Sequence, residues 1–162
     1  MTRLTAYTGS SLTVNIREEV TLNSKDYGST QSFTIASIAD INRRVLTITT
    51  TEAVIMTVAA APAGAGKFIN SKVKYMRFTN LDDTNFITLT FRNQDNDEVA
   101  IKVDAGNSFI WAGDNVDGMT AVMNATQDAD AASSTNFGSL TNVQADADTA
   151  SCDLEIFVAS VA

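Results

Sequence analysis

The sequence predicts an all-β protein, built as an antiparallel β-sandwich or jelly roll of about eight to ten strands. Two observations carry this prediction. Twenty-one of the 162 residues are threonine, and most of them stand inside runs of Val, Ile, Leu and Phe. Short alternations of apolar and polar residues recur along the chain, separated by clusters of Asn, Asp, Gly and Ser. β-Branched residues in period-two alternation are typical of half-buried strands, because one face of the strand packs on the core.

The strands can be placed from this alternation. Residues 12–16 alternate Leu, Val and Ile with Thr and Asn, and residues 20–22 extend or resume that strand. A second run covers residues 33–38 and is interrupted near Ala36. Two segments separated only by Thr51 and Glu52 are expected to form a tight hairpin, and four more strands with short polar turns are expected to form a meander. The hairpin segments are residues 45–50 and 53–59, and the meander strands are residues 73–79, 86–92, 98–103 and 109–111.

The length of the chain fits a single domain over residues 1–162. Residues 1–11 are expected to form a polar N-terminal arm, and residues 127–150, dominated by Asp, Ala, Ser, Thr and Asn, a long polar loop or arm. The chain then closes with a strand over residues 152–161. Cys152 is the single cysteine, and we expect it to be a small buried side chain at the start of that strand.

Acidic residues dominate the charge, with 11 Lys and Arg against 19 Asp and Glu, for a net charge of −8. Every basic residue lies at or before Lys102, whereas the last sixty residues contain nine acids and no base. This balance disfavours binding to nucleic acid or to an anionic membrane surface. Two explanations stay open for the acidic half: a solvated surface, or a surface that faces a basic partner such as the lysine-rich strand of a neighbouring copy.

Histidine, the side chain that most often acts as a general base, is missing. The chain has no histidine, which removes the commonest general base and zinc ligand, so we expect no enzyme, no catalytic residues, no cofactor and no metal site. Calcium is the weaker alternative, because carboxylate oxygens are its preferred ligands. Its candidate ligands are the clusters Asp95, Asp97 and Glu98, Asp128 and Asp130, and Asp146 and Asp148.

The basic cluster near the start of the expected meander is the candidate subunit interface. Lys72, Lys74 and Arg77 lie within six residues of one another, interleaved with aromatic residues, and Trp111 is the single tryptophan. Lysines also protect strand edges from unwanted pairing, and a tryptophan of a small β-domain commonly packs in the core. Both of these structural alternatives stay open beside the interface.

Residues 73–111 carry a resemblance. The run VKYMRFTN (residues 73–80), the turn LDDTN, the strand FITLTF, a polar turn, VAIKV (residues 99–103) and an Ala-Gly turn before Phe109 resemble small β-sandwich virion proteins of tailed bacteriophages. The resemblance implies a structural protein that decorates or cements a capsid. Its partners would be other virion proteins, above all the major capsid protein, and copies of itself in a homo-oligomer.

Two alternatives to capsid decoration stay open. One is a tail or head-tail connector component, and the other is a carbohydrate- or receptor-binding β-sandwich module. The first residues lack the apolar run of a signal peptide, so we expect no export by that route. The resemblance implies synthesis in the host cytoplasm and location in the virion.

Overall fold

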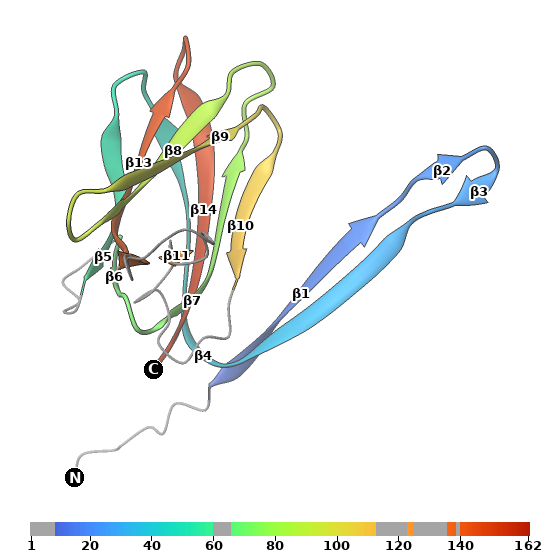
Figure 1. Cartoon of the computed structure of the whole chain (residues 1–162), viewed down its shortest axis with the longest axis horizontal. Helices are drawn as coiled ribbons and strands as arrows, with labels where there is room; N and C mark the ends of the chain where they lie inside the picture. The colour runs from blue at the N-terminus through green and yellow to red at the C-terminus, as the bar shows by residue number, and fades with distance from the viewer. Residues whose placement is uncertain (1–8, 60–65, 113–122, 125–135, 139) are drawn as a thin grey trace, which may run out of the picture.

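Two five-stranded β-sheets face each other in the computed structural model, which describes residues 9–59, 66–112, 123–124, 136–138 and 140–162 (Figure 1). The first sheet has the order β1 (Ser10–Glu18), β4 (Ser29–Ile48), β14 (Cys152–Val161), β7 (Val73–Asn80) and β10 (Ser108–Ala112). The second has the order β6 (Lys67–Ile69), β5 (Ala53–Ala59), β13 (Leu140–Ala147), β8 (Ile87–Asn93) and β9 (Glu98–Val103). Two short pairs complete the strands: β2 (Thr21–Leu22) with β3 (Lys25–Asp26), and β11 (Met123–Asn124) with β12 (Asn136–Gly138).

The strand order is that of a jelly roll. When β1 and β6 are set aside, β4-β14-β7-β10 faces β5-β13-β8-β9, and the chain passes repeatedly from one sheet to the other. The predicted all-β sandwich is therefore confirmed, with more strands than expected. Within the described ranges, no helix is long and apolar enough to cross a membrane.

The main core lies between the two sheets and is built from the inward side of each strand. Phe78 of β7 and Phe91 of β8 meet edge to face at its centre, with ring centroids 6.0 Å apart. Cys152, at the start of β14, is 1% exposed in this core, as the sequence predicted. Period-two alternation supplies these inward side chains, so each strand contributes to the core without any helix to cover it.

The expected meander is wrong, although its strands are present. β7 and β8 belong to different sheets, as do β9 and β10, and only β8 and β9 pair as a hairpin. The turn after β7 crosses between the sheets, and Asn80 fixes it from the inside. Its side-chain amide donates to the carbonyl oxygens of Asn85 (2.8 Å) and Val103 (3.2 Å), and its oxygen accepts the backbone N–H of Asp82 (3.0 Å).

The expected hairpin before residue 59 is wrong for the same reason, since β4 and β5 lie in opposite sheets. In a jelly roll, a short polar turn joins strands across the core as readily as beside one another. Alternation within each strand does not distinguish the two arrangements.

The prediction that residues 127–150 form a polar loop or arm is wrong in part. Residues 140–147 form β13, a central strand between β5 and β8. The inward residues of β13 are Leu140, Val143, Ala145 and Ala147, and register shifts put Leu140 and Val143 three residues apart. Because this spacing and the small alanines break the period-two alternation of large apolar residues, the sequence pattern did not predict the strand. Residues 127–135, like residues 1–8 of the expected N-terminal arm, lie outside the described part.

Candidate assembly interface

A long β-hairpin leaves the sandwich and is the feature that the fold does not need for its core. We call residues 10–37 the hairpin arm; it comprises β1, β2, β3 and the first part of β4. Figure 1 shows it starting at one end of the sandwich and projecting far beyond β10. β4 makes this possible because it is 20 residues long: its second half pairs with β14, and its first half pairs with β1.

A β-bulge at the base of the arm redirects the chain. Ser37 has a positive φ of 61°, and the register of β1 against β4 shifts between Ser10 and Leu12. Gly9 lies against this bulge, where an added Cβ would stand 2.8 Å from the Cα of Ser37. Bulges bend a strand and increase its twist, which explains how one strand serves both the sheet and the arm. The interruption that the sequence indicated near Ala36 is this bulge.

The tip of the arm is a two-residue turn. Asn23 and Ser24 both have positive φ, at 51° and 62°, and Leu22 pairs with Lys25 across them. Positive φ at both central residues defines the type I′ turn that joins hairpin strands. Sequence reasoning missed this hairpin; Asn23 was its signal, but the glycine that usually follows asparagine in such turns is replaced by Ser24.

The register of the arm sorts its side chains onto two different faces. Pairing runs without a shift from Leu12 opposite Ile35 to Glu18 opposite Ser29, and it resumes in the same register at β2 and β3. The backbone N–H of Tyr27 bridges the break by donating to the carbonyl of Val20 (2.9 Å). Because alternate residues share a face, the apolar face comprises Leu12, Val14, Ile16, Glu18, Val20, Leu22, Lys25, Tyr27, Ser29, Gln31, Phe33 and Ile35.

The opposite face of the arm is entirely polar. It comprises Thr13, Asn15, Arg17, Glu19, Thr21, Asp26, Gly28, Thr30, Ser32 and Thr34. Thr13 and Thr34 share a hydrogen bond across the strands at 3.3 Å. A ribbon with one apolar face buries that face against something else, because an isolated two-stranded hairpin is marginally stable in water.

The proximal part of the apolar face (Leu12, Val14, Phe33 and Ile35) packs on the outer surface of the first sheet. This contact forms a second apolar cluster, separate from the main core. Ile35 is 1% exposed there, and Tyr75 of β7 meets Phe157 of β14 edge to face at 5.8 Å between ring centroids. The base of the arm is therefore held to the sandwich by burial of apolar surface.

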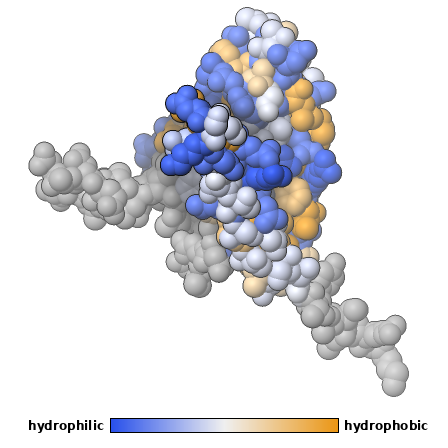
Figure 2. Space-filling view, turned by 90° about the vertical axis from the view of Figure 1, so that its right-hand side faces the viewer, coloured by the Kyte–Doolittle hydropathy of each residue, from blue (hydrophilic) through white to orange (hydrophobic). Residues whose placement is uncertain are grey.

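The distal part of the apolar face (Val20, Leu22 and Tyr27) and the neighbouring Ile16 lie in water. Ile16 is 42% exposed, and the three distal residues are 52%, 60% and 56% exposed. Four of the nine large apolar side chains that are exposed in the described structure thus fall within twelve residues of the arm. Figure 2 looks onto the side of the molecule from which the arm projects, where orange side chains lie among blue and white ones.

A groove lies where the arm diverges from the first sheet. We call it the arm–sheet groove; its volume is about 310 Å³. Leu12, Val14 and Ile16 line one wall, with Thr13 and Asn15, and Tyr75, Arg77, Ile110 and Phe157 line the other. Six of these nine residues are apolar, whereas Thr13, Asn15 and Arg77 make part of the lining polar. Ile110, at 38% exposed, is also among the exposed large apolar residues.

A three-residue ion cluster borders the groove on the outer surface of the first sheet. Glu155 of β14 accepts hydrogen bonds from Arg43 of β4 (2.7 Å from Nε to Oε2) and from Arg77 of β7 (2.5 Å from Nη2 to Oε1). Hydrogen bonds from Arg43 and Arg77 lower the pKa of Glu155 below its ordinary value. A base and an acid that we considered for contacts between copies, Arg77 and Glu155, therefore meet within one chain.

The other predicted interface residues lie elsewhere. Lys74 of β7 is 6% exposed, and Lys72 lies in the turn before that strand. Trp111 is partly buried and packs against the main core from β10. Of the four, only Arg77 lines the arm–sheet groove. The interface formed by all four residues stays a prediction.

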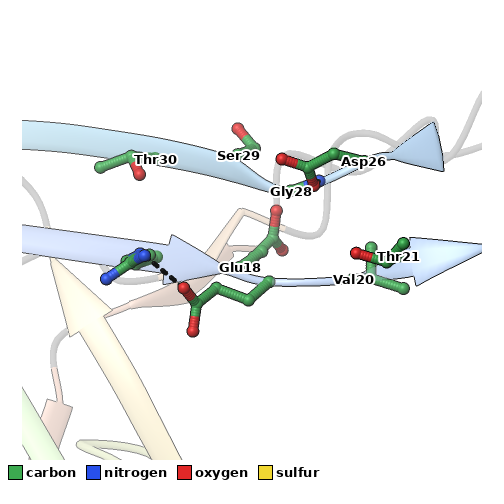
Figure 3. A pocket seen from close by; sticks show the side chains of 9 residues that line it. Glu18, Val20, Thr21, Asp26, Gly28, Ser29 and Thr30 are labelled. Atoms are coloured by element: carbon green, nitrogen blue, oxygen red, sulfur yellow. Dashed lines mark hydrogen bonds and ion pairs between the residues drawn. The ribbon is translucent and has the colours of Figure 1, made fainter. Parts of the chain in front are cut away.

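A second concavity, of about 420 Å³, lies beside the polar face of the arm. Figure 3 shows Glu18, Val20 and Thr21 along one strand and Asp26, Gly28, Ser29 and Thr30 along the other. Gly28 allows the close approach here, because a Cβ would stand 2.6 Å from the carbonyl oxygen of Glu18. Arg17 and Glu19 form an ion pair with both side chains 71% exposed, which makes this a solvated surface.

No reactive group stands out among the residues that the structure describes. Burial, and then the nearby Asp82 and Asp148, raise the pKa of the Cys152 thiol, which keeps it protonated and unreactive. At the candidate calcium ligands, Asp97 accepts a hydrogen bond from Asn93 (3.0 Å) and Glu98 pairs with Arg92. Within the described ranges, no three Cys, Asp or Glu side chains come together as a metal site. Asp128 and Asp130 lie outside those ranges.

Comparisons with known proteins add little to this description. No family model matches the chain, and no curated protein matches it. A solved structure from the study "Bacillus endospore appendages form a novel family of disulfide-linked pili" is similar over 99% of this chain and 98% of its own, with 11% identity and a TM-score of 0.44. A likeness this loose carries no argument about what the present chain does.

Proposed function

We propose that this protein is a non-catalytic structural subunit, and that its hairpin arm binds it to other proteins in a larger assembly. The observation that carries this proposal is the apolar face of the arm. That face continues in one register past the point where the sandwich supports it, so that Val20, Leu22 and Tyr27 are more than half exposed. Exposed apolar side chains on a projecting element mark a binding surface.

The geometry of the arm favours a binding role over a structural one within the chain. The distal part of the apolar face contributes nothing to either apolar cluster of the fold. Its exposed aliphatic and aromatic side chains gain apolar contacts only when a partner covers them. Burial of the exposed 60% of Leu22 would alone supply about 1–2 kcal/mol.

We propose further that the assembly is the virion of a tailed phage, and that the protein decorates or cements the outer shell by binding the major capsid protein. Support comes from the resemblance of residues 73–111 to small virion proteins and from the jelly-roll strand order. The net charge of −8 suits an outer surface better than contact with packaged DNA. Synthesis in the host cytoplasm and location in the virion belong to the same proposal.

Quantitative mass spectrometry of purified particles tests this proposal. We expect the protein to co-purify with the particles at a fixed ratio to the major shell protein, and to remain bound after a wash in high salt, because the contact is largely apolar. Absence from the particles, or a copy number that varies between preparations, would contradict the virion role.

A further inference from the structure

We propose that the distal part of the apolar face of the arm binds the arm–sheet groove of a second copy of this chain. This inference rests on the proposed function, since it names one partner of the arm. The donor is the tip of the ribbon: Leu22 and Tyr27 are 60% and 56% exposed, and Lys25 lies 5.1 Å from the Tyr27 ring, on the same face. These are the side chains that the second copy covers.

The acceptor is the open arm–sheet groove, which has a volume of about 310 Å³ and a lining of mixed polarity. Ile16 and Ile110, which line its two opposite walls, are 42% and 38% exposed, while Tyr75 and Phe157 form the lining on the sheet side. These apolar side chains of the lining bind other apolar side chains by releasing the water that covers them.

Continuity with a contact that the chain already makes identifies the occupant as a second copy. The proximal part of the same apolar face packs on Tyr75 and Phe157, and the groove begins where that contact ends. Tyr75 and Phe157 thus contact the proximal part of the apolar face and also line the groove, where they can contact the distal part of the same face of another copy. The distal part of the arm does not fill the groove of its own chain, because β2 and β3 project far from the sandwich (Figure 1).

The arm and the surface beside the groove also carry opposite net charges. Glu18 lies on the apolar face between its two apolar parts, and the segment from Arg17 to Asp26 carries one more acid than base. The ion cluster beside the groove carries one more base than acid, and Arg43 in it is 67% exposed. A docked arm places its acidic segment against this cluster, which adds orientation to the apolar contact.

The distal part of the arm and the groove are different surfaces, so the contact is head to tail: each copy donates one arm tip and accepts another. This arrangement makes a specific prediction about variants. A chain with a defective arm keeps a working groove, and a chain with a defective groove keeps a working arm. The two variants together form one contact that neither can form alone.

The test uses sedimentation velocity over a concentration series into the high micromolar range. The arm variant is Leu22→Ser with Tyr27→Ser, the groove variant is Ile16→Thr with Ile110→Thr, and the control is Val54→Thr with Leu81→Ser. The control residues are 56% and 51% exposed and lie outside the arm and the groove. All four proteins are first compared in thermal melts, where we expect similar midpoints because every changed side chain is exposed.

We expect the wild type and the control to self-associate, and each interface variant to bind its own kind at least about tenfold more weakly. An equimolar mixture of the arm and groove variants should form a 1:1 heterodimer and stop there.

Three results would each overturn the proposal: a wild type that is monomeric throughout, an interface variant that associates like the wild type, or a mixture in which the variants do not bind each other. A monomeric wild type would overturn only this inference, and mass spectrometry of purified particles would still test the proposed structural role.

Discussion

Ile35 and Ile16 lie on the same face of the arm, yet Ile35 is 1% exposed and Ile16 is 42% exposed. Three residue pairs of the ladder lie between them, and the support of the sandwich ends there. One amphipathic ribbon is thus part of the fold at its base and a free surface at its tip. This division gives each half its own expected response to mutation.

Ile35→Ala should destabilise the protein by about 2–4 kcal/mol, because it leaves a cavity between the arm and the first sheet. Ile16→Ala is the matched control, with an expected change within about 0.5 kcal/mol. Urea unfolding followed by tryptophan fluorescence measures both. Equal losses in the two variants would mean that the apolar face is not divided where the exposures place the boundary.

Glu155→Gln should weaken the protein at neutral pH and have little effect in acid. Arg43 and Arg77 lower the pKa of Glu155 in the folded chain. The ionised carboxylate therefore stabilises the fold above the ordinary glutamate pKa, and this contribution disappears as the pH falls through the lowered value.

The quantity to measure is the difference in free energy of unfolding between wild type and Glu155→Gln across an acid titration. We expect it to shrink toward zero as the pH falls. Glu19→Gln is the control, since the ion pair of Glu19 with Arg17 is largely exposed and contributes little. A difference that stays constant with pH would show that ionisation of Glu155 is not what stabilises the sheet surface.

Asn80→Ala should destabilise the fold by about 2–4 kcal/mol. Asn80 is 0% exposed, and its loss leaves the carbonyls of Asn85 and Val103 without their side-chain donor at the crossing between the sheets. Asn15→Ala, on the exposed polar face of the arm, serves as the control for the residue type. Denaturant midpoints compare the two variants. A loss of stability no larger than that of Asn15→Ala would show that Asn80 does not fix the crossing between the sheets.

Ser24→Gly should stabilise the tip of the arm by about 0.5–1 kcal/mol, because glycine adopts positive φ without a steric penalty. Hydrogen exchange is the suitable measurement, since the effect is local. The amide of Tyr27, which donates to Val20, should become better protected, while the amides of β14 should be unchanged. Ser24→Pro should have the opposite effect, since proline holds φ near −65°.

The positions of most strands follow from the sequence, but their pairing does not. Residues 86–92 and 98–103 alternate clearly and form β8 and β9 with nearly those bounds. Whether the next strand lies beside its neighbour or across the core depends on contacts such as the hydrogen bond from Asn80 to Val103, 23 residues away. Long-range contacts of this kind leave no local pattern.

The candidate site was harder to predict than the fold. The alternation in residues 12–22 predicts one or two ordinary strands. Nothing in it indicates that contact with the sandwich ends before Ile16. The basic cluster was predicted to be an interface because its residues are close together in the sequence. The structure instead buries Lys74 and pairs Arg77 with Glu155, 78 residues away.

The most direct test of the central claim shortens the arm. Glu18 and Ser29 face each other in the ladder, so residues 19–28 can be replaced by an Asn-Gly turn that closes the hairpin without Val20, Leu22 and Tyr27. Differential scanning calorimetry should give a melting temperature close to that of the wild type, and binding to purified particles or to other copies should be lost. A shortened protein that still binds as the wild type does would contradict the claim that the distal arm is the binding element.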